Sequence, residues 1–123
     1  MVVVDTSVFI DHLRGYKPAN DFFISLDDKD LLFSALSEAE LLSGKSCNDS
    51  EQRESILQFL KRWKKIDVTN PIAMMAGDLR RTYEITLSDA IIAATAIIYN
   101  MELLTRDISD FKGIKELKIR APY

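Results

Sequence analysis

Short apolar runs alternate along the chain with longer segments in which apolar residues recur every three or four positions. The short runs predict buried strands over residues 2–4, 31–34, 66–68, 102–105 and 117–119. The longer segments carry helix signals: Ser and Thr in capping positions, Pro in first turns and Gly at ends. They predict helices over about 6–14, 18–26, 37–44, 49–63, 71–83 and 88–98, with Ser37 as the cap of the third.

This alternation predicts an α/β fold, a five-stranded parallel sheet with helices on both faces, in one domain of residues 1–123. The last predicted helix is apolar on most sides and should lie in the middle of the fold. In such sheets, ligands bind beyond the carboxyl ends of the strands. Asp5 follows the first strand and Asp107 the fourth, so we expect both carboxylates at the edge where sites form.

Composition narrows the class of protein. Hydrophobic residues make up 47% and charged residues 28%, as in ordinary globular proteins. No apolar run approaches the roughly 18 residues of a membrane span, and Met1 leads directly into a strand rather than a secretory signal. The single cysteine, Cys47, excludes an internal disulfide and a multi-cysteine zinc site. We therefore expect a cytoplasmic protein that does not enter membranes.

The chain is mildly acidic, with a net charge of −3 and an isoelectric point of about 5.1. This argues against nucleic-acid binding through a broad basic face. It leaves open an acidic pocket that recruits a divalent cation and acts on a phosphodiester. It also leaves room for a basic partner.

Four acidic residues stand in apolar or otherwise special surroundings: Asp5, Glu40, Asp89 and Asp107. Each has an ordinary structural interpretation, as a helix cap, a surface residue, a first-turn acid or a turn former. If the four converge, like charges about 4 Å apart repel by ~4 kcal/mol per pair at an effective dielectric constant near 20. A hard cation such as Mg²⁺ or Mn²⁺ would relieve this repulsion, and nearby hydroxyls of Thr6, Ser7 and Thr105 could hold the carboxylates.

Four stretches carry a family resemblance: VVDTSVFID at 3–11, SEAELLSG at 37–44, SDAIIAATA at 88–96 and LLTRDISDF at 103–111. In this order they resemble PIN-domain proteins, and among these the VapC-type toxins of bacterial and archaeal toxin–antitoxin pairs. The resemblance spans nearly the whole chain. It implies a ribonuclease on a five-stranded parallel sheet that needs Mg²⁺ or Mn²⁺ to activate water.

The resemblance also assigns site residues. The family's catalytic acids match Asp5, Glu40, Asp89 and Asp107, of which Asp5, Asp89 and Asp107 would bind the metal. Its two supporting hydroxyls match Thr6 and Thr105, and Asp110 is a second acid after Thr105. The resemblance further implies an RNA substrate, a homodimer and a cognate VapB-type antitoxin whose tail enters the acidic groove.

Two other functions stay open at this point. A receiver-like phosphoacceptor domain has similar length and alternation, but it needs a pair of acids after strand one, an Asp after strand three and a Lys after strand five. Here the corresponding positions hold the single Asp5, the sequence Val-Thr-Asn at 68–70 and Arg120. A PIN fold that has lost activity and only binds a partner is the second alternative.

Three further residues have a functional and a structural interpretation. His12, the only histidine, suits a general base but more often would be an ordinary helix position. Arg106 could contact a phosphate or stand as a solvated charge. Trp63, in the basic run 61–65, could stack on RNA bases, but it fits the apolar side of its helix and is better explained as a core residue.

Overall fold

The computed structural model describes residues 1–27 and 29–123. In these residues five strands form one sheet: β1 (Val2–Val4), β2 (Leu31–Ser34), β3 (Lys64–Ile66), β4 (Glu102–Leu104) and β5 (Ile119–Arg120). Their order across the sheet is β3-β2-β1-β4-β5, and every neighbouring pair is parallel. The predicted α/β class and the five-stranded parallel sheet are confirmed.

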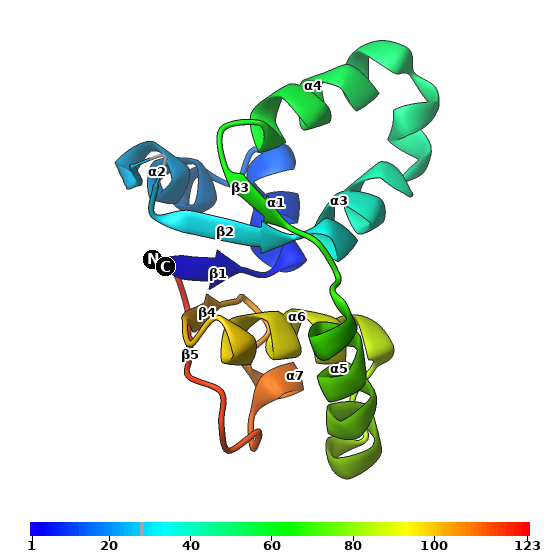
Figure 1. Cartoon of the computed structure of the whole chain (residues 1–123). Helices are drawn as coiled ribbons and strands as arrows, with labels where there is room; N and C mark the ends of the chain where they lie inside the picture. The colour runs from blue at the N-terminus through cyan, green and yellow to red at the C-terminus, as the bar shows by residue number, and fades with distance from the viewer. Residues whose placement is uncertain (28) are drawn as a thin grey trace.

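Helices cover both faces of this sheet (Figure 1). One face carries α1 (Thr6–Leu13), α2 (Lys17–Ser25), α3 (Ala35–Leu42) and α4 (Ser50–Leu60), with the 3-10 turn η1 (Lys45–Asn48) between the last two. The other face carries α5 (Asn70–Tyr83), α6 (Leu87–Ile98) and α7 (Ile108–Phe111). None of the helices in the described part of the chain combines the length and the hydropathy that a membrane-spanning helix needs.

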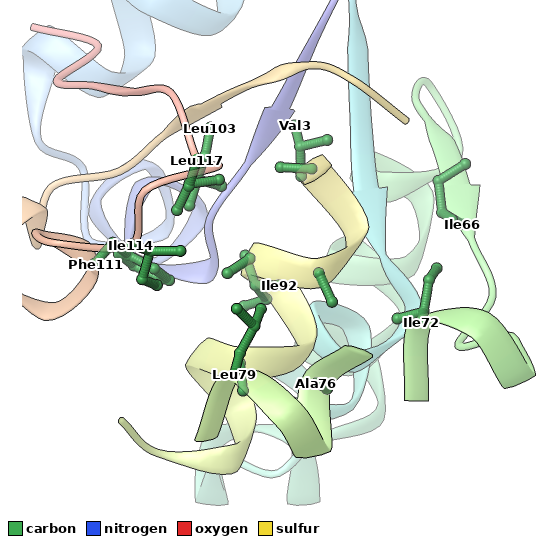
Figure 2. Close-up of a cluster of buried hydrophobic side chains, with 14 of the residues drawn as sticks. Val3, Ile66, Ile72, Ala76, Leu79, Ile92, Leu103, Phe111, Ile114 and Leu117 are labelled. Carbon is green, nitrogen blue, oxygen red and sulfur yellow. The ribbon is translucent and has the colours of Figure 1, made fainter. Parts of the chain in front are cut away.

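Successive strand residues point to opposite faces, and both faces are buried. Val4 and Leu104 pack into the hydrophobic cluster beneath α1, α2 and α4, whereas Val3 and Leu103 pack into the cluster around α5 and α6. Figure 2 shows the second cluster, where Ile92 of α6 lies among side chains from the sheet, α5 and the C-terminal segment. Burial on both faces explains why the strands are continuous apolar runs.

The apolar helix α6 lies at the centre of its layer, as predicted. Its buried residues are mostly alanine, which lets the sheet and α5 approach closely. Thr86 caps the helix, because its hydroxyl accepts a hydrogen bond from the backbone N–H of Asp89 at 3.1 Å. This cap fixes Asp89 in the first turn of α6.

The predicted start of the third helix is wrong. The helix begins at Ala35, and its cap is Ser34, whose Oγ accepts a hydrogen bond from Leu36 N at 3.1 Å. Ser34 also ends the buried strand β2, so one residue serves both elements and no loop separates them. Ser37 instead lies fully buried inside the helix.

The third and fifth strands are displaced from their predicted positions, 66–68 and 117–119, by about two residues. Both are edge strands. Each pairs with one neighbouring strand and has at most one buried side chain. Their apolar signal is therefore weak, and Lys64 and Lys65 of β3 do not resemble a buried run. Trp63 is only 5% exposed and packs near Phe23, which confirms the core interpretation. Its predicted place on a helix over 49–63 is wrong, because α4 ends at Leu60 and Trp63 lies in the turn before β3.

Replacing a buried residue of α6 should destabilise the fold far more than replacing an exposed one of the same type. Ile92 is 1% exposed and Ile24, on α2, is 79% exposed. We expect Ile92→Ala to lower the free energy of unfolding by about 2–5 kcal/mol, because it leaves a cavity. Ile24→Ala should change it by less than about 0.5 kcal/mol. Urea unfolding of both variants tests this, and equal losses would contradict the packing described.

Candidate active site

The carboxylate of Asp5 lies at the carboxyl end of the central strand β1 and is only 5% exposed. Its backbone N–H donates to Leu104 O at 2.9 Å, which continues the pairing of β1 with β4. The Thr105 hydroxyl, one residue beyond β4, donates to Asp5 Oδ2 at 2.8 Å. The Ser7 hydroxyl, from the first turn of α1, donates to the same oxygen at 2.8 Å.

These two hydroxyls also hold the turn that follows β4. The backbone N–H of Arg106 donates to Ser7 Oγ at 3.1 Å, and that of Asp107 donates to Thr105 Oγ1 at 2.9 Å. Each hydroxyl thus receives an amide hydrogen while it gives its own hydrogen to Asp5. The path of the chain through residues 105–107 is therefore tied to the position of the Asp5 carboxylate.

Glu40 is held in a similar way on the other side of the site. It lies on α3, which begins directly at the end of β2, and Figure 1 shows β1 and β2 pointing toward this helix. The Thr6 hydroxyl donates to Glu40 Oε1 at 2.7 Å and lies 2.8 Å from Ser37 Oγ. Ser37 is therefore buried against Thr6 of α1 and does not cap its own helix. Thr6, Ser7 and Thr105 all bond to acidic side chains, as the sequence suggested.

The four predicted acids line one pocket. Its volume is about 310 Å³, and its walls include Asp5, Glu40, Asp89 and Asp107 together with Thr6, Ser7, Ile10 and Ser43. Ile10 and Ser43 were not predicted, because neither side chain has a distinctive spacing. Asp110 is exposed in α7 and does not line this pocket. Four segments distant in sequence therefore bring their acidic residues to one hollow.

Burial and mutual repulsion disfavour negative charge in this pocket. Burial raises the pKa of Asp5, and the nearby Asp107 charge adds to the effect, while the hydroxyls of Thr105 and Ser7 oppose it. Partial burial raises the pKa of Asp89 from 3.8 to about 6, with further contributions from the charges of Asp5, Asp110 and Glu40. A cation would remove this penalty.

The side chains of the pocket suit a hard cation chemically. Carboxylate and hydroxyl oxygens are the donors that Mg²⁺ and Mn²⁺ prefer. Among residues 1–27 and 29–123, no three His, Cys, Asp or Glu side chains stand close enough to hold one ion as they are placed. The candidate metal ligands thus line one pocket, but they are not arranged around a single ion position.

The other candidates lie outside the pocket. His12 stacks on Phe59 of α4, with ring centroids 4.4 Å apart and an angle of 18° between the planes. It therefore belongs to the contact between α1 and α4, as the ordinary interpretation held. Arg106 is not a free solvated charge, because its guanidinium pairs with Asp11 of α1.

Comparison with known proteins assigns the chain to a family. Residues 2–117 match the PIN domain. This match covers nearly the whole chain and includes every element that supplies a residue to the pocket. The chain therefore belongs to the PIN domain family.

Curated relatives match nearly the whole chain. One, named Ribonuclease VapC10 from Mycobacterium tuberculosis, is 36% identical over 124 residues, which covers 96% of this chain and 91% of the relative. A second, Ribonuclease VapC19 from the same species, is 33% identical over 129 residues, covering 96% and 98%. Ribonuclease VapC from Rickettsia bellii is 30% identical, covering 96% and 93%.

Solved structures share the fold. A toxin–antitoxin complex from Klebsiella pneumoniae contains a chain that superimposes with a TM-score of 0.85 at 28% identity, covering 100% of this chain and 98% of that one. VapBC2 from Rickettsia felis, bound to a DNA fragment from its promoter, matches with a TM-score of 0.82 at 28% identity and 98% coverage of both chains.

The raised pKa of Asp89 predicts how stability depends on pH in the absence of metal. Between 3.8 and about 6 the folded chain binds more protons than the unfolded chain, so stability falls as pH rises through this window and stays lower above it. Asp89→Asn removes the charge. We expect the variant to be more stable than wild type at neutral pH by about 1 kcal/mol, after allowance for solvent screening. The difference should vanish near pH ~4.

Urea unfolding in chelator across this pH range measures the difference. The matched control is Asp78→Asn, because Asp78 lies on α5 with its side chain 69% exposed. We expect no pH-dependent gain from this control. A gain of equal size in both variants, or none in Asp89→Asn, would show that the pocket does not penalise the Asp89 charge.

Proposed function

We propose that the chain is a metal-dependent endoribonuclease, the toxin of a type II toxin–antitoxin pair, which hydrolyses RNA phosphodiesters. The observation that carries the proposal is the convergence of Asp5, Glu40, Asp89 and Asp107 on one pocket at the carboxyl edge of the sheet. Relatives that span nearly the whole chain are named ribonucleases, which supports the same conclusion.

In this proposal Asp5, Asp89 and Asp107 hold the cation and Glu40 completes the acidic set. Mg²⁺ or Mn²⁺, when bound, lowers the pKa of a water molecule and neutralises charge on the phosphodiester. Ser7 and Thr105 keep Asp5 aimed at the pocket by their hydrogen bonds to Oδ2, and Thr6 does the same for Glu40. Asp110 adds negative charge near Asp89 from outside the pocket.

The pocket is suited to hydrolysis. A phosphodiester is cut when the oxygen of water bonds to phosphorus and the bond from phosphorus to the leaving ribose oxygen breaks, while the water loses a proton and the leaving oxygen gains one. An acidic pocket without a cation repels the phosphate. Burial, and to a smaller extent the neighbouring carboxylate charges, raises the pKa of Asp5 and Asp89, so a cation would also favour their charged forms. The chain's own residues therefore hold the metal ligands in position, and RNA cleavage should depend on added Mg²⁺ or Mn²⁺.

The proposal includes partners. The structural relatives from Klebsiella pneumoniae and Rickettsia felis are toxin–antitoxin complexes, which supports a VapB-type antitoxin for this chain. A basic segment of such a partner would complement the acidic pocket. We also propose a homodimer that acts in the cytoplasm, where its RNA substrate is found. Membership of the PIN family leaves the receiver-like alternative without support, so a catalytically silent PIN domain is the remaining competitor.

RNA cleavage by the purified chain tests the proposal. We expect structured RNA to be cut with Mn²⁺ or Mg²⁺ and to stay intact with chelator. Asp5→Asn should lower the rate at least about 100-fold, because it removes a charged ligand while it keeps the shape of the side chain. Asp21→Asn, which removes an exposed ion pair with Lys17 on α2, is the control and should cleave normally.

Thermal unfolding of each variant checks that a loss of cleavage is not caused by a loss of the folded structure. Cleavage that persists in chelator or in Asp5→Asn contradicts the proposed mechanism. A wild-type chain that binds Mn²⁺ and an antitoxin but leaves RNA intact supports the silent binding module instead.

A further inference from the structure

A cluster outside the pocket surrounds the guanidinium of Arg106. Arg106 pairs with the carboxylate of Asp11, and its guanidinium lies over the rings of Tyr16 and Tyr123, 5.3 Å and 5.4 Å from their centroids. The Tyr123 hydroxyl donates to Asp11 Oδ2 at 2.7 Å. We call Asp11, Tyr16 and Tyr123 the arginine clamp.

The clamp joins segments that are far apart in the sequence. Asp11 comes from α1, Tyr16 from the turn between α1 and α2, and Tyr123 from the segment after β5. The bond between Tyr123 and Asp11 spans 112 positions of the chain. Burial and the hydrogen bond to Asp11 raise the pKa of Tyr123, so its hydroxyl keeps its hydrogen at physiological pH.

The same arginine is tied to the candidate site through its backbone. Its N–H donates to Ser7 Oγ, and Ser7 donates to Asp5 Oδ2. The residues on either side of Arg106 are Thr105, which bonds to Asp5, and Asp107, which lines the pocket. The arginine clamp therefore holds the turn 105–107 from outside the pocket, and the hydroxyls of Ser7 and Thr105 hold it from the side of Asp5.

We propose that Asp11, Tyr16 and Tyr123 are positioning residues, which hold Arg106 and thereby fix the turn that aims the Asp107 carboxylate into the pocket. This inference rests on the proposed function for its catalytic consequence. The turn needs such support, because Asp107 is exposed and the nearby carboxylate of Asp5 repels its charge.

The other role for Arg106 is a contact with an RNA phosphate. The geometry favours positioning, because the charge of Arg106 is already matched by Asp11 and its guanidinium lies over two rings. An RNA phosphate would have to compete with these contacts. The two roles differ in what they change: positioning alters the affinity for metal, and phosphate contact alters the affinity for RNA.

The first test needs neither metal nor RNA. Amide hydrogen exchange of Arg106 and Asp107, followed by NMR, reports the two hydrogen bonds that hold the turn. We expect roughly tenfold faster exchange in Asp11→Asn and a smaller increase in Tyr123→Phe, which keeps the ring. Asp21→Asn, whose ion pair lies on α2, should leave both rates unchanged. Unchanged exchange in Asp11→Asn would overturn the inference even if the chain proves to be a nuclease.

The second test separates positioning from RNA contact. Binding of Mn²⁺ to the metal-free chain, followed by electron paramagnetic resonance, should need roughly tenfold more metal in Asp11→Asn. The RNA concentration for half-maximal cleavage, at saturating Mn²⁺, should stay the same. Adding Arg106→Gln to Asp11→Asn should leave this RNA concentration unchanged as well, although it also removes the contacts of the guanidinium with the rings of Tyr16 and Tyr123.

Two results overturn the positioning role. Unchanged Mn²⁺ affinity in Asp11→Asn is one. The other is a further rise in the RNA concentration when Arg106→Gln is added, which assigns Arg106 to the substrate. A wild-type chain that fails to bind Mn²⁺ counts against the proposed function alone, and the exchange rates still decide whether the clamp holds the turn.

Discussion

The two hydrogen bonds from Ser7 and Thr105 to Asp5 Oδ2 are the interaction on which the candidate site depends. An ionised carboxylate that is 5% exposed costs several kcal/mol in a protein interior unless hydrogen bonds or an opposite charge compensate it. Parallel pairing of β1 with β4 supplies one of these hydrogen bonds, because it brings Thr105 to the end of β1, and the first turn of α1 supplies the other through Ser7. The same hydroxyls fix the turn that presents Asp107, so the sheet determines the geometry of the pocket.

Part of the fold is legible in the sequence because its strands are buried on both faces. Strands 2–4 and 31–34 were predicted at their observed positions, and the apolar helix 88–98 was expected at the centre. Prediction failed where elements share residues or lie at an edge. Ser34 ends a strand and caps a helix at once, so Ser37 was mistaken for the cap. In the edge strand β3 only Ile66 is buried, so the strand has no continuous apolar run in the sequence.

The site was predicted unevenly, for a physical reason. Strand ends meet at one edge of a parallel sheet, so Asp5 and Asp107 follow from the order of elements. Glu40 and Asp89 lie within helices; their apolar surroundings marked them as candidates, but only the family resemblance assigned them to the catalytic set. The arginine clamp has no signature in the sequence, because Tyr123 and Asp11 meet through folding and not through any spacing. Such long-range side-chain contacts require coordinates.

A crystal structure of the chain soaked in Mn²⁺, with anomalous diffraction measured at the manganese edge, tests most directly whether the carboxylates share one cation. We expect an anomalous peak inside the pocket, within bonding distance of an Asp5 oxygen, with Asp89 and Asp107 drawn toward it. The Asp5→Asn crystal should lack the peak. A fully occupied manganese ion bound elsewhere, with the pocket carboxylates unmoved, would show that these carboxylates do not share a cation.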